Sequence, residues 1–168
     1  MADDSDGFGE TLEVGLIVGR VQPSNRWADP SWRPVAILPA PAAAAPWTAL
    51  GTEGLTERFY AGPVALAFHR SETANYRDNL ATGRPLVWVA LGAAGAEPPI
   101  EIRVVTADPA EGEALAGIAS ENVDTVPMPA EIAAALEAFV ATHHVERAFY
   151  KRRRDEAPAA PACGIDGE

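Results

Sequence analysis

Residues 11–21 have the sequence Thr-Leu-Glu-Val-Gly-Leu-Ile-Val-Gly-Arg-Val, and this stretch decides the fold class of the chain. β-Branched residues dominate it and its two glycines disfavour a helix, so it predicts a long strand. Gly15 and Gly19 lie inside this strand, where glycine marks a bulge or the close approach of another backbone. A dinucleotide-binding loop requires glycines after the strand, at the start of a helix, so that function is excluded.

Further strands are predicted downstream from apolar runs that turn residues bound. They lie at residues 34–38, 56–60, 63–69, 86–91, 100–106 and 123–126. Ala61-Gly62 is expected to be the turn that pairs the second and third of these strands. The continuous apolar run from Leu86 to Leu91 is expected in the centre of the sheet.

Two short helices are predicted between the strands. The first covers residues 71–80, with Ser71 as its capping residue and a stop before Gly83. The second starts at Asp108, a capping acid followed by a proline in the first turn and by a glutamate three residues after the cap.

A third helix is predicted over residues 130–144, where the apolar residues share one face. This amphipathic C-terminal helix completes an α+β fold. Its mainly antiparallel sheet could roll into a half-barrel, with the last helix packed across one side.

Length and charge indicate a single domain at residues 11–154 between two disordered tails, 1–10 and 155–168. The net charge is −11, and eight of the 24 acidic residues lie in these tails. This acidity argues against binding to nucleic acid or to an anionic membrane. No apolar run is long enough to span a bilayer, and the acidic start is unlike a secretory signal, so we expect a cytoplasmic protein.

The residues that most often bind metals are few. Cys163 is the single cysteine, so neither an intrachain disulfide nor a cysteine zinc site is expected. His143 and His144 are adjacent on the last helix, where neighbouring side chains point about 100° apart. We therefore expect no metal site, no cofactor and no catalytic residue.

The densest polar cluster of the chain spans residues 69–79, and it has two interpretations. As an enzyme or small-molecule site, His69 and Glu72 would transfer protons and Arg70 would bind an anion. As structure, Tyr76 would hydrogen-bond to the backbone and Asn79 would stabilise a turn. The structural interpretation is favoured because no nucleophile motif or phosphate loop accompanies the cluster.

Exposed aromatic and basic residues are the candidate contacts with a protein partner. Trp27 and Trp32 lie in a turn-rich loop, where they either cap one end of the core or anchor a partner. The basic run at 151–154 either complements a helix dipole or docks on an acidic protein surface. The predicted contacts are Trp27, Trp32, Phe149, Tyr150, Lys151, Arg152, Arg153 and Arg154.

An ordered set of short motifs carries a family resemblance. The set comprises Trp27…Trp32-Arg33-Pro34-Val35, His69-Arg70-Ser71-Glu72 with Tyr76 and Asn79-Leu80, Pro85-Leu86-Val87-Trp88-Val89, Thr106-Ala107-Asp108-Pro109, Val123-Asp124-Thr125-Val126-Pro127-Met128-Pro129 and Phe149-Tyr150-Lys151-Arg152-Arg153-Arg154. From Leu12 to Arg154 the chain resembles an uncharacterised proteobacterial family, domain of unknown function 3305. Members are typically encoded beside respiratory molybdenum formate dehydrogenases.

This resemblance implies a non-enzymatic accessory or adaptor protein that assists the assembly or regulation of a formate dehydrogenase, whose components would be its partners. It implies no catalytic residue. Two alternatives stay open: a small-molecule-binding protein or enzyme that uses the His69–Asn79 region, and a structural subunit of a larger complex.

Overall fold

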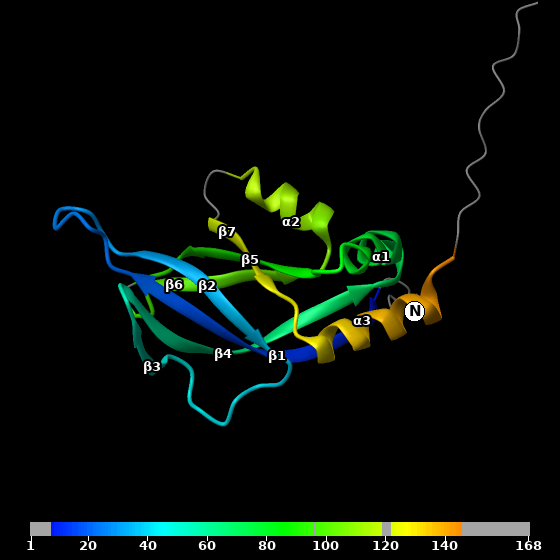
Figure 1. The fold of residues 1–168 in the computed structure, drawn as a ribbon, viewed down its shortest axis with the longest axis horizontal. Helices are drawn as coiled ribbons and strands as arrows, with labels where there is room; N and C mark the ends of the chain where they lie inside the picture. Colours follow the sequence, from blue (N-terminus) through cyan, green and yellow to red (C-terminus); the bar gives the residue numbers. More distant parts are fainter. Residues whose placement is uncertain (1–7, 96, 119–121, 146–168) are drawn as a thin grey trace, which may run out of the picture.

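Seven strands and three α-helices form the described part of the computed structural model, residues 8–95, 97–118 and 122–145 (Figure 1). In chain order these are β1 (Phe8–Val21), β2 (Ser31–Leu38), β3 (Thr48–Glu53), β4 (Thr56–His69), the 3₁₀ turn η2 (Arg70–Glu72), α1 (Thr73–Ala81), β5 (Leu86–Ala93), β6 (Ile100–Thr106), α2 (Pro109–Ala116), β7 (Asn122–Pro127) and α3 (Ala130–His143). All strand pairs are antiparallel, so the predicted α+β class with mainly antiparallel strands is confirmed.

The strands divide into two sheets. One has the order β2-β1-β4-β3 and the other β6-β5-β7, with β5 in the centre as predicted. β2 lies beside β7 and β4 beside β6, and the side chains of both sheets share one hydrophobic core. Within the described residues the strands do not join into a closed barrel.

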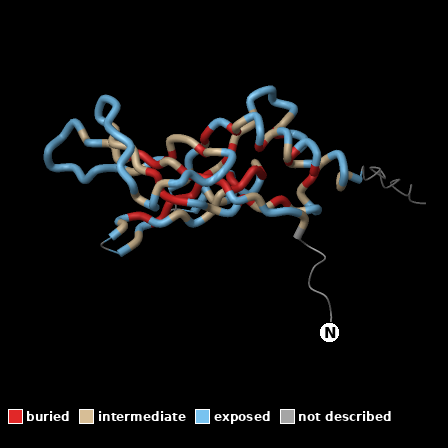
Figure 2. Tube along the Cα trace, turned by 90° about the horizontal axis from the view of Figure 1, so that it is seen from below, coloured by how far each residue is buried: buried red, intermediate tan, exposed pale blue. Residues whose placement is uncertain are grey.

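The core lies in the middle of the molecule, where Figure 2 shows most of the buried chain. Val14, Leu16 and Val18 alternate along β1 and are completely buried. Such a period of two places them on one face of the sheet. Phe139 of α3 packs on Phe68 of β4, with ring centroids 5.5 Å apart, and so joins the last helix to this sheet.

The strand β4 is continuous, so the predicted turn at Ala61-Gly62 is wrong. Gly62 has a φ of +115°, and the register with β1 shifts opposite Leu16 and Ile17. A glycine adopts this backbone conformation at little cost, and the result is a β-bulge that bends the strand without reversing it.

The strand β3 was not predicted from the sequence. All six of its residues are exposed, so it carries no alternation of apolar and polar side chains. Its register with β4 instead follows from the pairing of the backbones.

The helix α1 begins later than predicted because Ser71 is not its capping residue. Ser71 lies in the 3₁₀ turn and its hydroxyl donates to the Glu72 carboxylate at 2.8 Å. The second prediction is confirmed: the Asp108 carboxylate accepts from the Ala110 amide at 2.8 Å, and α2 follows. The predicted C-terminal helix is α3, whose buried residues are Ile132, Leu136 and Phe139.

Gly112 of α2 is required by the close approach of this helix to β5. A Cβ atom at this position would lie 2.1 Å from Cγ of Trp88. Glycine weakens a helix by about 1 kcal/mol, and here that cost accompanies the packing of the helix backbone against an indole.

The limits of the described chain bear on two predictions. β1 begins at Phe8, three residues before the predicted strand, whereas residues 1–7 and 155–168 of the predicted tails lie outside the described residues. Among the helices that are described, none has the length and apolar character that crossing a membrane requires.

Candidate functional site

The polar cluster at residues 69–79 holds the backbone of three segments together. The Tyr76 hydroxyl accepts from the His69 amide at 3.0 Å. The Asn79 amide group donates to the Leu86 and Ala107 carbonyls at 2.8 and 2.9 Å, and its oxygen accepts from the Leu86 amide at 3.0 Å. We call Tyr76 and Asn79 with these backbone partners the Asn79 hub.

Both side chains of the hub are buried, and burial changes the chemistry of the phenol. Desolvation raises the pKa of Tyr76 to about 12, because the phenolate would lose its hydration inside the protein. The His69 amide that donates to the hydroxyl opposes this rise in the pKa. Tyr76 therefore stays protonated and serves as a hydrogen-bonding group.

The hydrogen bonds of Glu72 are local, and Arg70 faces solvent. Glu72 accepts hydrogen bonds from Ser71 and Asn75, which are its neighbours in the chain. Arg70 is exposed, and His69 is the last residue of β4. These positions agree with the structural interpretation of the cluster.

The other two histidines lie at the end of α3, where His144 reaches α1. Nδ1 of His144 is 3.1 Å from the Thr73 hydroxyl and its Nε2 is 3.0 Å from the Arg77 guanidinium, so the end of α3 is attached to α1. The His143 ring packs on Phe139 at 4.6 Å. The part of the chain that the structure describes contains no group of three or more metal-ligating side chains.

The two predicted tryptophan contacts have different environments. Trp27 lies in the loop between β1 and β2 and is 85% exposed, so it does not cap the core. Trp32 is half-buried in β2 and packs against the core. The other predicted contacts, residues 149–154, lie outside the described residues.

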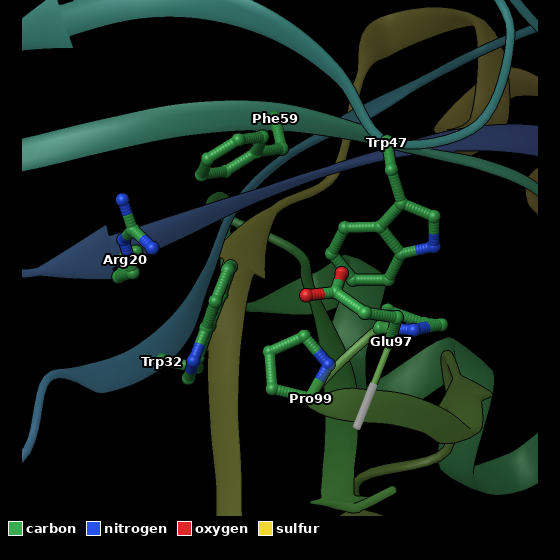
Figure 3. A pocket seen from close by; sticks show the side chains of 7 residues that line it. Arg20, Trp32, Trp47, Phe59, Glu97 and Pro99 are labelled. Carbon is green, nitrogen blue, oxygen red and sulfur yellow. The ribbon is translucent and has the colours of Figure 1, made fainter. Parts of the chain in front are cut away.

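Trp32 forms part of a pocket of about 420 Å³, which we call the aromatic pocket (Figure 3). It is lined by Arg20, Trp32, Trp47, Phe59, Glu97, Pro98 and Pro99. A volume in this range is typical of sites that hold a small ligand or a side-chain anchor. Its lining comes from β1, β2, β4 and two loops that are distant in sequence.

Strand register explains three walls of the aromatic pocket. Arg20 continues the alternation of Val14, Leu16 and Val18 on the core face of β1. Trp32 pairs with Arg20 across β2, and Phe59 pairs with Val18 across β4. Paired residues project to the same face, so both aromatic rings lie beside the Arg20 side chain.

Trp47 reaches the pocket from a strained backbone position. Its φ is +68°, a conformation that costs a bulky residue about 1–3 kcal/mol. The loop is closed by the Thr48 hydroxyl, which donates to the Ala45 carbonyl at 2.7 Å, and the Trp47 amide donates to the Tyr60 carbonyl. The surrounding hydrogen bonds thus hold the indole against the pocket at the expense of backbone strain.

The Trp32 ring contacts the other two aromatic rings of the pocket. The Trp32 and Trp47 centroids are 6.0 Å apart at an interplanar angle of 87°, and those of Trp32 and Phe59 are 5.6 Å apart. The Trp32 carbonyl also accepts from the Asn122 side chain at 2.7 Å, which attaches this wall to β7. The pocket is therefore shaped before any ligand arrives.

The charges at the pocket leave one carboxylate unpaired. The Arg20 guanidinium forms an ion pair with Glu57 and lies 6.0 Å from the Trp32 centroid and 5.7 Å from that of Phe59. Figure 3 shows the Glu97 carboxylate pointing into the hollow between the rings. Among the described residues no cation forms an ion pair with Glu97, whereas Arg20, the one cation of the lining, is paired with Glu57 outside it.

A second hollow, of about 250 Å³, lies on the opposite face of the same sheet end. It is lined by Arg33, Val35, Glu53, Thr56 and Arg58. Arg33 directly follows Trp32 and Arg58 directly precedes Phe59 in the sequence. Because successive side chains of a strand alternate between faces, both arginines project to the face opposite the aromatic pocket. Glu53 pairs with Arg58, which leaves this face with one net positive charge from Arg33.

Sequence reasoning identified Trp32 and missed most of the other pocket residues. Arg20 could have been found, because a charged residue that continues an apolar alternation lies on the core face. Trp47 and Glu97 carry no comparable signal. Both belong to loops. The loop of Trp47 joins β2 to β3 within the four-stranded sheet, whereas that of Glu97 joins β5 to β6, so the distance of Glu97 from Trp32 depends on how the two sheets pack.

Comparison with known proteins shows the family of the chain. A family model described as "Protein of unknown function (DUF3305)" matches residues 13–153, so the chain belongs to this family. No curated protein and no solved structure matches the chain.

Proposed function

We propose that this chain is a non-enzymatic adaptor of the cytoplasm that acts through protein contacts, and that its partner is a component of a molybdenum formate dehydrogenase. The observation that carries the adaptor role is the 85% exposure of Trp27 at the sheet end that holds the aromatic pocket. The identity of the partner as a formate dehydrogenase rests on the family resemblance, and the capture experiment below tests it.

The loop end of the four-stranded sheet presents apolar side chains beyond the core. Leu55 in the turn between β3 and β4 is 62% exposed, and Leu50 of β3 is 48% exposed. The Gln22 amide donates to the Leu55 carbonyl at 2.9 Å, so the loop of Trp27 starts beside this turn. Figures 1 and 2 show both loops at the end of the sheet away from α1 and α3.

Exposed residues of this kind are typical of binding anchors. Tryptophan is enriched among the residues that contribute most to protein–protein affinity, because it buries a large rigid surface. Trp27 and Leu55 lie in loops at the same sheet end as the aromatic pocket, so this end offers exposed anchors and a recess. The basic run at 151–154 would add a second contact with an acidic surface of the same partner.

The enzyme alternative is less well supported by the contacts of this region. Of the groups that it requires, Glu72 is hydrogen-bonded to Ser71 and Asn75, and the neighbouring Tyr76 and Asn79 bond to the backbone in the Asn79 hub. The adaptor role accounts for the exposed surface that such an enzyme would leave unexplained.

The test is capture of formate dehydrogenase components from the native host by the tagged full-length chain, followed by mass spectrometry and by binding to the purified component. Trp27→Ser should reduce capture at least tenfold, the effect expected of a strong anchor. Ile118→Ser, at a residue that is 47% exposed after α2, is the matched control and should not change it. Failure of the folded wild-type chain to capture any formate dehydrogenase component would contradict the proposed partner.

The basic run is tested separately in the full-length chain. Replacing Arg152, Arg153 and Arg154 together by alanine should leave the protein folded and weaken capture. Unchanged capture by the folded triple variant would exclude the second contact.

A further inference from the structure

We propose that the aromatic pocket binds a single basic side chain, preferably arginine, that projects from the partner protein. This inference rests on the proposed adaptor function and specifies the chemistry of one contact. The juxtaposition that carries it is the Glu97 carboxylate inside a hollow walled by Trp32, Trp47 and Phe59.

The walls suit a cation because aromatic faces carry partial negative charge. A guanidinium or ammonium within about 6 Å of such a ring gains roughly 0.5–2 kcal/mol, depending on its desolvation. The pocket already shows this preference internally, since Arg20 lies 6.0 Å from the Trp32 centroid and 5.7 Å from that of Phe59. Trp47 and the far side of Trp32 remain for a second cation.

The charges of the pocket indicate that its ligand is a cation. Arg20 is neutralised by Glu57, so it neither attracts an anion strongly nor repels a cation strongly. Glu97 points into the hollow without a cationic partner among the described residues. A ligand cation would pair with this carboxylate while its planar group packs on the indoles.

Arginine fits better than lysine for geometric reasons. The guanidinium is planar, stacks on aromatic faces and can donate two parallel hydrogen bonds to one carboxylate. Pro98 and Pro99 complete the lining with apolar surface, against which the methylene stem of an arginine can pack. Lysine offers a compact, strongly hydrated ammonium, so it should bind more weakly.

The opposite face of the sheet end would reject the same ligand. Its hollow holds Arg33 and Arg58 with one carboxylate, Glu53, already paired to Arg58. A cation should therefore enter the aromatic pocket and not the second hollow. This difference between the faces would orient the partner on the sheet end.

The experiment titrates the full-length protein with the peptide acetyl-Gly-Gly-Arg-Gly-Gly-amide and follows the indole N–H signals by NMR. The signals of Trp32 and Trp47 should shift, whereas that of Trp88, which packs under α2, should not. The same peptide with citrulline, a neutral analogue of arginine, should bind at least tenfold more weakly. Equal binding of the two peptides, or no shift of Trp32 and Trp47, would overturn the proposal.

Variants test whether Glu97 provides the charge. Glu97→Gln should weaken the arginine peptide roughly five- to tenfold. Glu131→Gln, which removes the same charge at an exposed position in the first turn of α3, should leave the affinity unchanged. An equal loss in both variants would mean a general effect of net charge and would exclude a built site.

Choline distinguishes a side chain of a partner from a free small cation. It should bind more weakly than the arginine peptide, and tighter binding of choline would contradict a partner's side chain as the ligand.

The adaptor function and the pocket inference can be contradicted independently of each other. If wild type and Glu97→Gln capture the partner equally, the pocket inference fails and the adaptor role stands. If nothing is captured, the adaptor role fails while the peptide titration still decides the pocket.

Discussion

The Asn79 hub and the aromatic pocket show two different uses of polar residues in one small domain. In the hub, side chains bond to backbone groups of β5 and of the residue before Asp108, and little bonding capacity is left for a ligand. In the pocket, residues from β1, β2, β4 and two loops surround a hollow. A cluster of polar residues close together in the sequence therefore belongs to the scaffold. The candidate site, in contrast, is formed by residues from segments that are distant in the sequence.

The difference has an energetic consequence. A buried polar group that loses its partner costs about 1–3 kcal/mol, so changes in the hub should lower the free energy of unfolding. Exposed groups at the loop end contribute little to folding, so changes there should alter binding alone. Mutations in the two regions test this difference, and they follow in order of their expected effect on stability, from the largest to the smallest.

Replacing Asn79 by alanine should have the largest effect on stability. The change removes three hydrogen bonds and leaves the Leu86 amide and two carbonyls without this partner in a buried site. We expect a loss of about 3 kcal/mol in the free energy of unfolding. Urea denaturation followed by circular dichroism measures it, and a loss below about 1 kcal/mol would show that the hub is not a structural centre.

Replacing Asp108 by alanine should have the next largest effect. Asp108 is 5% exposed, and its carboxylate accepts from the Ala110 amide in the first turn of α2. Loss of an N-cap of this kind costs about 1–2 kcal/mol, and Asp108→Asn should recover most of it because an amide oxygen can also cap. Thermal unfolding should place the three proteins in the order wild type, Asn, Ala.

Much of this scaffold could be predicted from sequence because its signals are local. The β-branched residues and glycines of 11–21, the apolar run at 86–91 and the cap at Asp108 are all signals that neighbours in the chain provide. The sequence predicts a turn at Gly62 because glycine is common to turns and bulges, and only the pairing with β1 distinguishes the two. The division into two sheets also depends on pairing over long distances.

The candidate site was less predictable for the same physical reason. Trp27 and Trp32 stand close together in the sequence, yet one is exposed and the other packs on the core. Trp47 and Glu97 join Trp32 only through loop geometry and the packing of the sheets. No periodicity in the chain encodes such a meeting of loops.

Tyr76→Phe should have a smaller effect at neutral pH and a distinctive one at high pH. The His69 amide loses its acceptor, so we expect a loss of about 1 kcal/mol at pH 7. Because burial raises the pKa of Tyr76 from 10 to about 12, the folded state retains a proton that the unfolded state releases above pH 10. Wild-type stability is therefore complete below pH 10 and falls as pH rises toward 12, by up to about 1.4 kcal/mol per pH unit.

The phenylalanine variant lacks this titration, so its stability should fall less steeply than that of wild type between pH 10 and 12. The control is the folded Trp27→Ser variant, which changes an exposed residue, retains Tyr76 and should keep the wild-type slope. If the free energy of unfolding falls equally steeply with pH in wild type and in Tyr76→Phe, then Tyr76 is not the cause of this pH dependence.

The smallest effect on stability should come from the loop end. Trp27 and Leu55 are 85% and 62% exposed, so replacing both by serine removes little buried surface, and the free energy of unfolding should change by less than about 0.5 kcal/mol. The same double variant should lose capture of the partner, whereas Asp108→Asn, with its cap retained, should keep it. A loss of stability above about 1 kcal/mol in the double variant would mean that the side chains of the two loops support the fold and belong to the scaffold. The two regions would then differ in degree only, and exposure alone would no longer identify the binding surface.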